Sequence, residues 1–315
     1  MKDLRILFMG TPDFAVATLK TIIEHNYTVV GVITAPDKPA GRGRKIKSSA
    51  VKEYAISQNL HVLQPTNLKD EQFLESLKNL KANLQVVVAF RMLPKVVWDM
   101  PLYGTFNLHA SLLPDYRGAA PINWAIINGE EKTGITTFFI DEKIDTGKII
   151  LQKEVAILKD DTAGKLHDKL MIKGASLVIE TLKAIENDIV ETIKQSEKGI
   201  SKTAYKLHKD NTKIDWNDTM QSIYNHIRGL SPYPTAWCLL TNKGKEEAVK
   251  IYEVLIEKET HAHDTGKIII ENTSIKVAVK NGYITITKLQ LPGKKAMDAK
   301  SLLNGYTFFK DAKMG

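Results

Sequence analysis

A chain of 315 residues that is 43% hydrophobic and 25% charged has the composition of an ordinary globular protein and is long enough for two domains. Its single cysteine, Cys238, excludes an internal disulfide and favours a reducing compartment, and the apolar run around it (AWCLL) predicts a buried, unreactive thiol. No apolar run approaches the ~20 residues of a membrane span, and the N-terminus has no signal-peptide core, so we expect a cytoplasmic protein.

The net charge is +8, and most of it lies in the last third of the chain. Residues 201–315 carry 18 Lys and Arg against 12 Asp and Glu, which gives +6. A basic balance of this size permits nucleic-acid binding without establishing it.

The first elements predict a βαβ unit. Residues 4–9 form an apolar strand that ends at Gly10, and a helix follows with Thr11 as its N-cap. A second strand is expected at residues 27–34, which implies a parallel pair with a right-handed crossover. The turn after Gly10 lacks G-x-G-x-x-G, which counts against a dinucleotide-dependent dehydrogenase.

Residues 37–47 (DKPAGRGRKIK) form a basic, glycine-containing loop. A solvated loop is the commoner fate of such a run. The other interpretation is an arm that meets phosphates and becomes ordered on contact. Charge and glycine content leave both open.

The remaining elements of this half alternate between helices and strands. Helices are predicted at residues 48–59, 69–81, 119–128 and 161–186, and strands at 61–63, 84–90, 104–108, 134–140 (near the sheet edge) and 148–154. This order predicts an α/β, Rossmann-like, mostly parallel sheet in a domain of residues 1–188.

The chain changes character after a polar stretch, and we expect a linker at residues 189–202. A helix is predicted at residues 216–230, followed by five short strands at 235–240, 249–256, 266–270, 274–280 and 282–289. Five short strands in residues 203–315 predict a small β-barrel of the oligonucleotide-binding (OB) type.

Residues 105–121 (TFNLHASLLPDYRGAAP) carry the most polar chemistry of the chain. On a strand, Asn107 and His109 share one face and Leu108 takes the other. An isolated N-x-H is more often a structural pair than a catalytic one. The prolines and Gly118 that follow predict a rigid loop after the strand, where an open α/β sheet places its chemistry.

A second candidate is Asp145, in the sequence Asp-Thr-Gly. Such a tripeptide is usually only a turn in which the Asp bonds nearby backbone N–H groups. It could instead return a carboxylate to the active end of the sheet, where it would orient His109. The residues alone do not choose between the two.

The gapless run N-L-H-x-S-L-L-P-x-x-R-G-x-x-P resembles the hallmark of folate-dependent formyltransferases. The resemblance extends over nearly the whole chain to the methionyl-tRNA formyltransferase family, through G-T-P-D-F at residues 10–14, P-A-G-R-G at 39–43, D-T-G at 145–147, I-D-W at 214–216 and P-G-K-K-A at 292–296. The basic loop and the basic barrel favour this tRNA branch over the single-domain purine enzyme.

The resemblance implies roles for named residues. The catalytic trio would be Asn107, His109 and Asp145. Folate would be contacted by Ser111, Leu112, Leu113 and Pro114, and by Phe90, Arg91, Met92 and Leu93, where this chain has F-R-M-L-P in place of a longer run containing Tyr-Gly. The tRNA would be contacted by Arg42, Arg44, Lys45, Lys47, Lys294 and Lys295.

The implied reaction is transfer of the formyl group of 10-formyltetrahydrofolate to the α-amino group of methionyl initiator tRNA. A metal site is not expected, because the histidines lack ligand spacing, and no membrane or obligate protein partner is implied. Two alternatives stay open. One is a formyltransferase or formyl-folate hydrolase acting on a small molecule, such as glycinamide ribonucleotide or a nucleotide sugar. The other is a tRNA-binding protein without catalysis.

Overall fold

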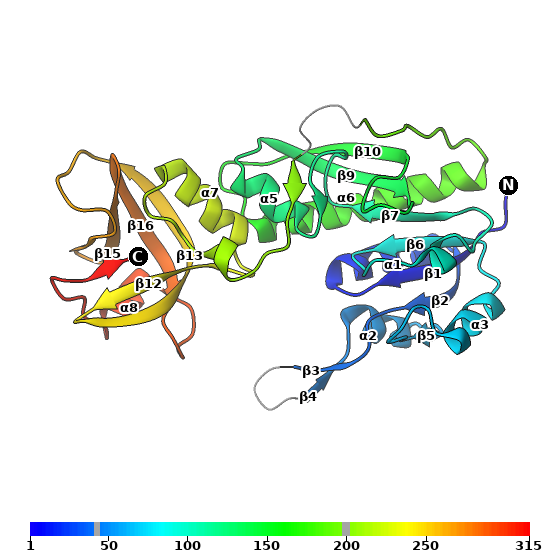
Figure 1. Ribbon diagram of the computed structural model, residues 1–315, viewed down its shortest axis with the longest axis horizontal. Coiled ribbons are helices and arrows are strands. Elements are labelled where there is room, and N and C mark those ends of the chain that lie inside the picture. Colours follow the sequence, from blue (N-terminus) through cyan, green and yellow to red (C-terminus); the bar gives the residue numbers. More distant parts are fainter. Residues whose placement is uncertain (41–44, 197–201) are drawn as a thin grey trace. The chain divides into compact units, whose positions relative to one another are not determined.

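The chain folds into two compact units, shown in a computed structural model that describes residues 1–40, 45–196 and 202–315 (Figure 1). The first unit comprises Met1–Gly118, Thr133–Ala156 and His167–Thr203. The second comprises Ala119–Lys132, Ile157–Leu166 and Ala204–Gly315. Each unit is therefore built from more than one segment of the sequence.

A seven-stranded sheet forms the centre of the first unit, in the order β10-β9-β7-β6-β1-β2-β5. The strands are β1 (Arg5–Gly10), β2 (Thr28–Ile33), β5 (Val62–Leu63), β6 (Leu84–Val88), β7 (Thr105–His109), β9 (Lys132–Phe139) and β10 (Ile149–Ala156). The five strands from β7 to β5 run parallel, and β9 is antiparallel to β7. This sheet confirms the predicted mostly parallel α/β class.

Helices pack on this sheet and complete its core. They are α1 (Asp13–Glu24), α2 (Ala50–Ser57), α3 (Glu71–Asn79), the short α4 (Lys95–Trp98), which was not predicted, and α6 (Ala163–Glu186). The predicted N-cap of α1 is wrong, because the cap position is Pro12 and no side chain caps the helix. Phe8, Phe106 and Phe138 are among the largest fully buried side chains of the core.

Strand β9 is the second strand of the sheet, next to the edge strand β10, which confirms the predicted position near the sheet edge. Its threonines Thr133, Thr136 and Thr137 are all buried. Two of them have internal partners: Thr137 Oγ1 lies 2.8 Å from Thr181 Oγ1, and Thr136 Oγ1 donates to the carbonyl of Ser111 at 2.6 Å. Hydrogen bonds inside the fold make these hydroxyls compatible with burial.

The strand order of this sheet reverses beside β1. The chain builds β2 and β5 on one side of β1, then returns to build β6 and β7 on the other side. In an open α/β sheet, such a reversal leaves a crevice at the carboxyl ends of the two strands where the connections diverge. Here these are the ends of β1 and β6, next to the end of β7.

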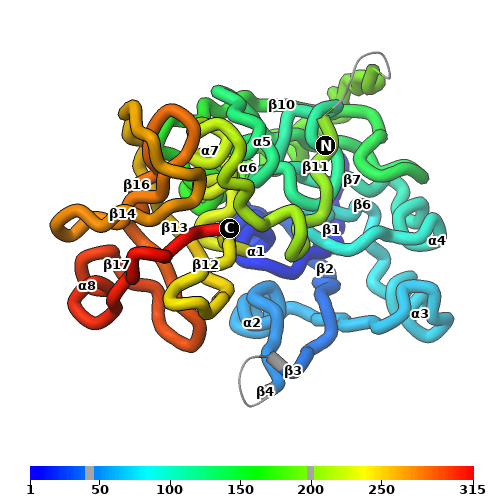
Figure 2. Tube along the Cα trace, turned by 60° about the vertical axis from the view of Figure 1, so that its left-hand side comes forward, coloured from blue at the N-terminus to red at the C-terminus, as the bar shows by residue number. Residues whose placement is uncertain are grey.

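The basic segment forms a hairpin of β3 (Lys38–Ala40) and β4 (Lys45–Lys47), where an irregular loop was predicted. Figures 1 and 2 both show it projecting from the first unit beyond α2. At its base, Asp37 pairs with Lys52 (2.5 Å) and accepts a hydrogen bond from Gln64 (2.9 Å). The bond from Lys52 lowers the pKa of Asp37, so the carboxylate is a stable anchor for the hairpin.

The second unit contains a small antiparallel barrel, as predicted. Its sheet runs β14-β15-β16-β13-β12-β18, and an antiparallel bridge between Lys267 and Lys313 joins the two ends. The strands are β12 (Ala236–Asn242), β13 (Lys245–Lys258), β14 (Ile268–Glu271), β15 (Ser274–Val279), β16 (Gly282–Gln290), β17 (Met297–Asp298), which pairs with β16, and β18 (Lys313–Met314). The helices are α5 (Pro121–Ile127), η1 (Asp210–Thr212), α7 (Met220–Leu230) and the unpredicted α8 (Ala299–Leu303); short strands β8 (Arg117–Gly118) and β11 (Thr203–Ala204) lie in the connecting segments.

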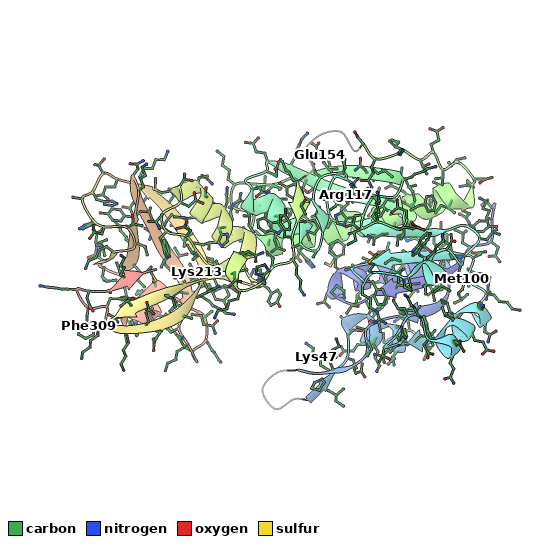
Figure 3. All side chains as sticks on the ribbon, viewed as in Figure 1. Lys47, Met100, Arg117, Glu154, Lys213 and Phe309 are labelled. Carbon is green, nitrogen blue, oxygen red and sulfur yellow. The ribbon has the colours of Figure 1, made fainter. Side chains whose placement is uncertain are left out.

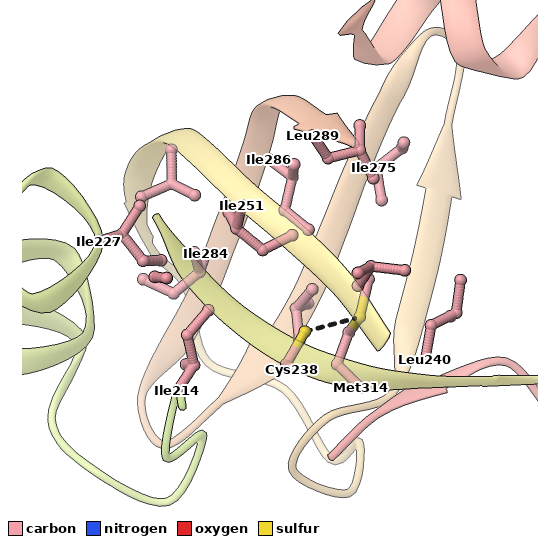
Figure 4. Packing of buried hydrophobic residues seen from close by; sticks show 14 of the residues in the cluster. Ile214, Ile227, Cys238, Leu240, Ile251, Ile275, Ile284, Ile286, Leu289 and Met314 are labelled. Carbon is pink, nitrogen blue, oxygen red and sulfur yellow. Dashed lines mark hydrogen bonds between the residues drawn. The ribbon is translucent and has the colours of Figure 1, made fainter. Parts of the chain in front are cut away.

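Cys238 lies in the core of this barrel, which confirms its predicted burial (Figure 4). Its Sγ lies 3.4 Å from Sδ of Met314, in a cluster that includes isoleucines of α7, β13, β14, β15 and β16. Burial raises the pKa of the thiol to about 12, so almost none of it is thiolate at neutral pH. Within the described residues, no helix combines the length and the apolarity that a bilayer crossing requires.

We therefore expect Cys238 to react with a thiol reagent at least about a thousand times more slowly in the folded protein than in the unfolded chain, because reaction requires the barrel to open. The measurement is the labelling rate with a chromogenic disulfide across a urea series. The labelling midpoint should coincide with loss of tryptophan fluorescence. Fast labelling without urea would contradict the buried position.

Candidate active site

The carboxyl end of β7 carries both polar side chains of the N-x-H motif. His109 is 6% exposed and Asn107 is half-buried, and their register on β7 places them on one face. Leu108 is buried on the opposite face, where it packs on α6. A Cβ at Gly174 would lie only 2.8 Å from Cδ2 of Leu108, so the missing side chain lets the helix approach the strand. The predicted alternation of β7 is confirmed.

The imidazole of His109 lies between two acceptors. Nε2 is 2.9 Å from the carbonyl oxygen of Tyr116, which is a hydrogen-bond distance. Nδ1 is 3.8 Å from Oδ2 of Asp145, which is an ion-pair distance but too long for a hydrogen bond. Because both neighbours are acceptors, the doubly protonated ring is the form that offers each of them a donor.

Asp145 reaches His109 through the tight turn that follows β9. The backbone of Asp145 has a left-handed φ of 55°, which Asp adopts more readily than most residues. Its Oδ2 accepts a hydrogen bond from the N–H of Gly118 at 2.9 Å. Asp-Thr-Gly is therefore a turn that also returns a carboxylate to the end of the sheet, and this answers the question that the sequence left open.

Gly147 is required by the same turn. A Cβ on this residue would overlap the carbonyl oxygen of Phe139, which belongs to the strand that the turn leaves. Backbone cannot move aside as a flexible side chain can, so residue 147 has to be glycine for the turn to lie this close to β9.

Gln195 also contacts this turn, and nothing in the sequence pointed to it. Its side-chain N–H groups donate to the carbonyls of Asp145 (2.9 Å) and Gly147 (2.8 Å). Its oxygen accepts from Nε (3.1 Å) and Nη2 (2.5 Å) of Arg117, a residue marked in Figure 3. A single glutamine in a polar stretch carries no recognisable signal, which explains why it was missed.

The segment from Ser111 to Pro114 is held by internal hydrogen bonds. The Ser111 hydroxyl donates to the carbonyl of Asp115 (2.6 Å), and the Leu113 N–H donates to Oγ1 of Thr136 (3.2 Å). The carbonyl of Leu113 accepts from Nε2 of Gln152 at 2.9 Å. Leu112 packs on β9 at Gly134, where a Cβ would meet its side chain. These hydrogen bonds fix the conformation of the segment that follows His109 in the chain.

The loop of Phe90–Leu93 follows β6, the parallel neighbour of β7. Arg91 donates to the carbonyls of Pro65 and Thr66, which ties the loop to the segment after β5. Leu93 is buried, Phe90 is half-buried, and Met92 is 69% exposed. The loop thus leaves the flexible apolar side chain of Met92 exposed at the carboxyl end of β6, where the crevice is expected.

The predicted tRNA-binding residues fall into two groups. Lys47 is exposed on β4 (Figure 3), and Lys45 belongs to the same strand, whereas Arg42 and Arg44 lie outside the described residues. Lys294 and Lys295 are exposed in the turn between β16 and β17 of the second unit. In the described part of the chain, no group of three or more His, Cys, Asp or Glu side chains could hold a metal ion.

We expect Gly147→Ala to lower the free energy of unfolding by about 2 to 4 kcal/mol, because the added methyl group overlaps backbone. Gly305→Ala is the control, since a Cβ at Gly305 has nothing within 4 Å and it should change stability by less than about 0.5 kcal/mol. Urea unfolding measures both. Equal stability of the two variants would contradict the close approach of the turn to β9.

Comparison with known proteins identifies the family. Residues 4–182 match the family model described as Formyl transferase, and residues 206–307 match that described as Formyl transferase, C-terminal domain. The chain is 64% identical over 314 residues to the methionyl-tRNA formyltransferase of Flavobacterium johnsoniae, with all of both chains covered. It is 53% identical over 318 residues to that of Bacteroides thetaiotaomicron, with 99% of each covered.

Solved structures share the fold. A sugar 3N-formyl transferase, crystallised in the presence of dTDP and 5-N-formyl-THF, aligns with a TM-score of 0.64 at 22% identity and covers 94% of this chain and all of its own. HypX from Aquifex aeolicus in complex with tetrahydrofolic acid gives a TM-score of 0.64 at 16% identity and covers 96% of this chain and 47% of its own. At these identities the likeness concerns the fold alone. The two family models and the full-length relatives show that this chain belongs to the methionyl-tRNA formyltransferase family.

Proposed function

We propose that the chain transfers the formyl group of 10-formyltetrahydrofolate to the α-amino group of methionyl initiator tRNA, giving N-formylmethionyl-tRNA for translation initiation. The observation that carries the proposal is that the side chains of His109 and Asp145 lie at ion-pair distance at the end of β7. Asn107, two residues before His109 on the same strand, adds an amide on the same face. The names of the full-length relatives support the tRNA substrate.

The reaction is an acyl transfer to nitrogen. An amine that has lost its proton attacks the formyl carbon, negative charge develops on the formyl oxygen, and the leaving nitrogen of the folate takes up a proton. The amine is itself a competent nucleophile, so no serine or cysteine relay is needed. The site therefore has to supply a donor for the developing charge and a group that carries protons.

We assign the donor role to Asn107. Its side-chain amide has no hydrogen-bond partner among the described residues, although it is half-buried. Such an amide, next to the paired His109 and Asp145, can form its hydrogen bonds with substrate instead. Its N–H groups are suited to stabilise the oxyanion as it forms.

We assign proton transfer to His109, through Nδ1. Nε2 is engaged by the carbonyl of Tyr116, whereas Nδ1 has no hydrogen bond at 3.8 Å from Asp145. When Nδ1 takes a proton from the amine, the carboxylate of Asp145 stabilises the charged ring; the ring can then return the proton to the leaving nitrogen. Asp145 thus acts on the chemistry through its negative charge.

We propose that folate occupies the crevice at the carboxyl ends of β1, β6 and β7. Phe90, Arg91, Met92 and Leu93 would line one side, and Ser111, Leu112, Leu113 and Pro114 the other. The exposed Met92 suits contact with a flat aromatic ring, since methionine adapts its shape and its sulfur interacts well with such rings. The hydroxyl of Ser111 is already bonded within its own segment, so that residue would hold this side of the crevice in place.

We propose that the tRNA is bound by Arg42, Arg44, Lys45 and Lys47 of the basic segment 37–47 and by Lys294 and Lys295. The charge of +6 in residues 201–315 supports binding of a polyanion by the barrel. By function we assign catalysis to a domain of residues 1–188, the linker to 189–202 and tRNA binding to 203–315; the compact units divide the chain differently, since residues 119–132 and 157–166 belong to the second unit. We place the protein in the cytoplasm, with the translation apparatus that uses its product.

A single assay tests the proposed function. Labelled 10-formyltetrahydrofolate is offered with aminoacylated initiator tRNA, with elongator methionyl-tRNA and with glycinamide ribonucleotide in parallel. Transfer should occur to initiator methionyl-tRNA and be at least about tenfold slower with the other two acceptors. Transfer to glycinamide ribonucleotide at an equal or higher rate would reject the tRNA assignment, and so would the absence of any transfer.

Asn107→Ala should lower kcat by about 100-fold or more, since one oxyanion donor is worth ~3 kcal/mol. His109→Ala should abolish measurable transfer while the protein stays folded, because the imidazole that faces Asp145 is the group assigned to carry the proton. Single-turnover kinetics give the rates, and circular dichroism checks folding. Asn79→Ala and His61→Ala, two exposed positions of the first unit, are matched controls. Near-normal turnover of either site variant would remove that residue from the mechanism.

Removing charge at Arg42 and Arg44 should weaken use of tRNA and leave folate binding intact, because in the sequence the two positions fall between β3 and β4, apart from the segments assigned to folate. We expect KM for tRNA to rise about tenfold for the double alanine variant, and the slope of log KM against log salt to fall by about 1 to 2. Lys69→Ala with Lys78→Ala removes the same charge from exposed positions and serves as the control. Equal losses of tRNA and folate affinity would reject the assignment.

A further inference from the structure

We propose that Gln195 is a positioning residue for Asp145. It lies 50 positions beyond Asp145 in the sequence, after α6, in the segment that leads towards the second unit. The proposal deepens the function proposed for Asp145 and rests on it. It assigns to Gln195 the task of holding the turn that presents the Asp145 carboxylate to His109.

The amide of Gln195 uses its full hydrogen-bonding capacity. Its two N–H groups donate to the carbonyls of Asp145 and Gly147, and its oxygen accepts twice from Arg117. A primary amide has two donors and an oxygen with two lone pairs, so nothing is left over. The side chain is 5% exposed, which excludes water as an alternative partner for most of it. The amide has only one orientation that fits, since a flip would direct its oxygen at two carbonyl oxygens.

The turn needs an external support of this kind. Asp145 has a left-handed φ of 55°, a conformation that costs a non-glycine residue about 1 to 2 kcal/mol. The carbonyls of Asp145 and Gly147 both face the side-chain nitrogen of Gln195; the first contact is partly buried and the second is buried. Leaving a buried acceptor unpaired costs about 1 to 3 kcal/mol. Gln195 bonds both carbonyls at once and so stabilises the conformation that the carboxylate requires.

Two features fix Gln195 at this position. Ile193 and Ile149 form an antiparallel bridge with two backbone hydrogen bonds, of 2.8 and 2.9 Å, which lays the segment beside β10. Gln195 follows two residues later in the same segment. Arg117 then holds the amide from the other end.

Arg117 connects the amide to the partners of His109. It stands between Tyr116, whose carbonyl faces Nε2 of His109, and Gly118, whose N–H is bonded to Asp145. The contacts form a closed ring from His109 through residues 116–118 to Gln195, on to Asp145 and back to His109. A shift of Gln195 would therefore move the carboxylate relative to the imidazole, although Gln195 touches neither side chain.

Substitution of Gln195 by methionine and by glutamate separates positioning of Asp145 from simple anchoring of Arg117. Gln195→Met keeps the length of the side chain and removes both donors, and we expect kcat to fall about 10- to 100-fold with KM for both substrates within about twofold. Gln195→Glu keeps an acceptor for Arg117 but directs a carboxylate oxygen at two carbonyls. It should lose at least as much kcat as the methionine variant. If Gln195 only neutralised or anchored Arg117, the glutamate variant would be as active as the wild type.

Gln85→Met is the matched control. Gln85 is 1% exposed in β6 and accepts a hydrogen bond from Thr105 at 2.9 Å, so the substitution also removes a buried amide, but away from the turn. It should lower stability without changing kcat per folded molecule.

The decisive readout is the effect of Gln195→Met in an Asp145→Asn background. If Gln195 acts through the carboxylate of Asp145, adding Gln195→Met to the Asp145→Asn variant should lower kcat by no more than about twofold. A loss as large as in the wild type would overturn the proposal, and so would a wild-type kcat for Gln195→Met.

Hydrogen exchange provides a test that does not depend on activity. The N–H of Gly118 is bonded to the Asp145 carboxylate, and its exchange should accelerate at least about tenfold in Gln195→Met while the amides of β6 stay protected. Unchanged exchange at Gly118 would reject the positioning role even if no transfer were detected. Absence of transfer by the wild-type protein with accelerated exchange in the variant would reject the proposed function alone.

Discussion

The geometry of the site depends on one hydrogen bond, from the N–H of Gly118 to the carboxylate of Asp145. It joins two segments that are 27 positions apart, the loop after β7 and the turn after β9. The same carboxylate oxygen faces His109, so this bond sets the direction from which negative charge reaches the imidazole. Without it, β7 would still present Asn107 and His109 on one face, but the ring would lack its counter-charge. The sheet supplies the first two groups, and the meeting of two loops supplies the third.

The sequence carried enough information for the parallel sheet, for the barrel and for the pair on β7, because each rests on a local period. Alternation in residues 105–109 fixes which side chains share a face, and apolar runs between helices predict parallel strands. Local sequence patterns were less informative where tertiary contacts determine whether a polar side chain is buried or whether a segment pairs as a strand. Two buried threonines of β9, Thr136 and Thr137, have their hydroxyl partners in distant segments, at Ser111 and Thr181, and the hairpin of β3 and β4 has no apolar pattern at all.

The same distinction explains what could be predicted of the site. Asp145 was recognisable as a candidate, but its role depends on a left-handed backbone and on the close approach of Gly147 to Phe139. Both are properties of the folded chain, so the sequence could not choose between a turn and a functional carboxylate. Gln195 was beyond reach, since its contacts require the bridge of Ile193 to Ile149 and the fork of Arg117. Glutamine as a residue type has no preference for a buried position beside a turn, so nothing in the sequence signalled it.

Most of the groups that orient the site belong to the backbone. The carbonyl of Tyr116 holds Nε2 of His109, the N–H of Gly118 holds Asp145, and the carbonyls of Asp145 and Gly147 receive the amide of Gln195. A backbone group keeps its chemistry whatever side chain it carries, so this shell is sensitive to φ and ψ rather than to residue type. That places the strongest constraints on residues with special conformations, namely Tyr116 and Asp145 with positive φ and Gly147 against Phe139. The side chains that the chemistry itself requires are then few, and a compact turn with one buried amide is enough to keep them aligned.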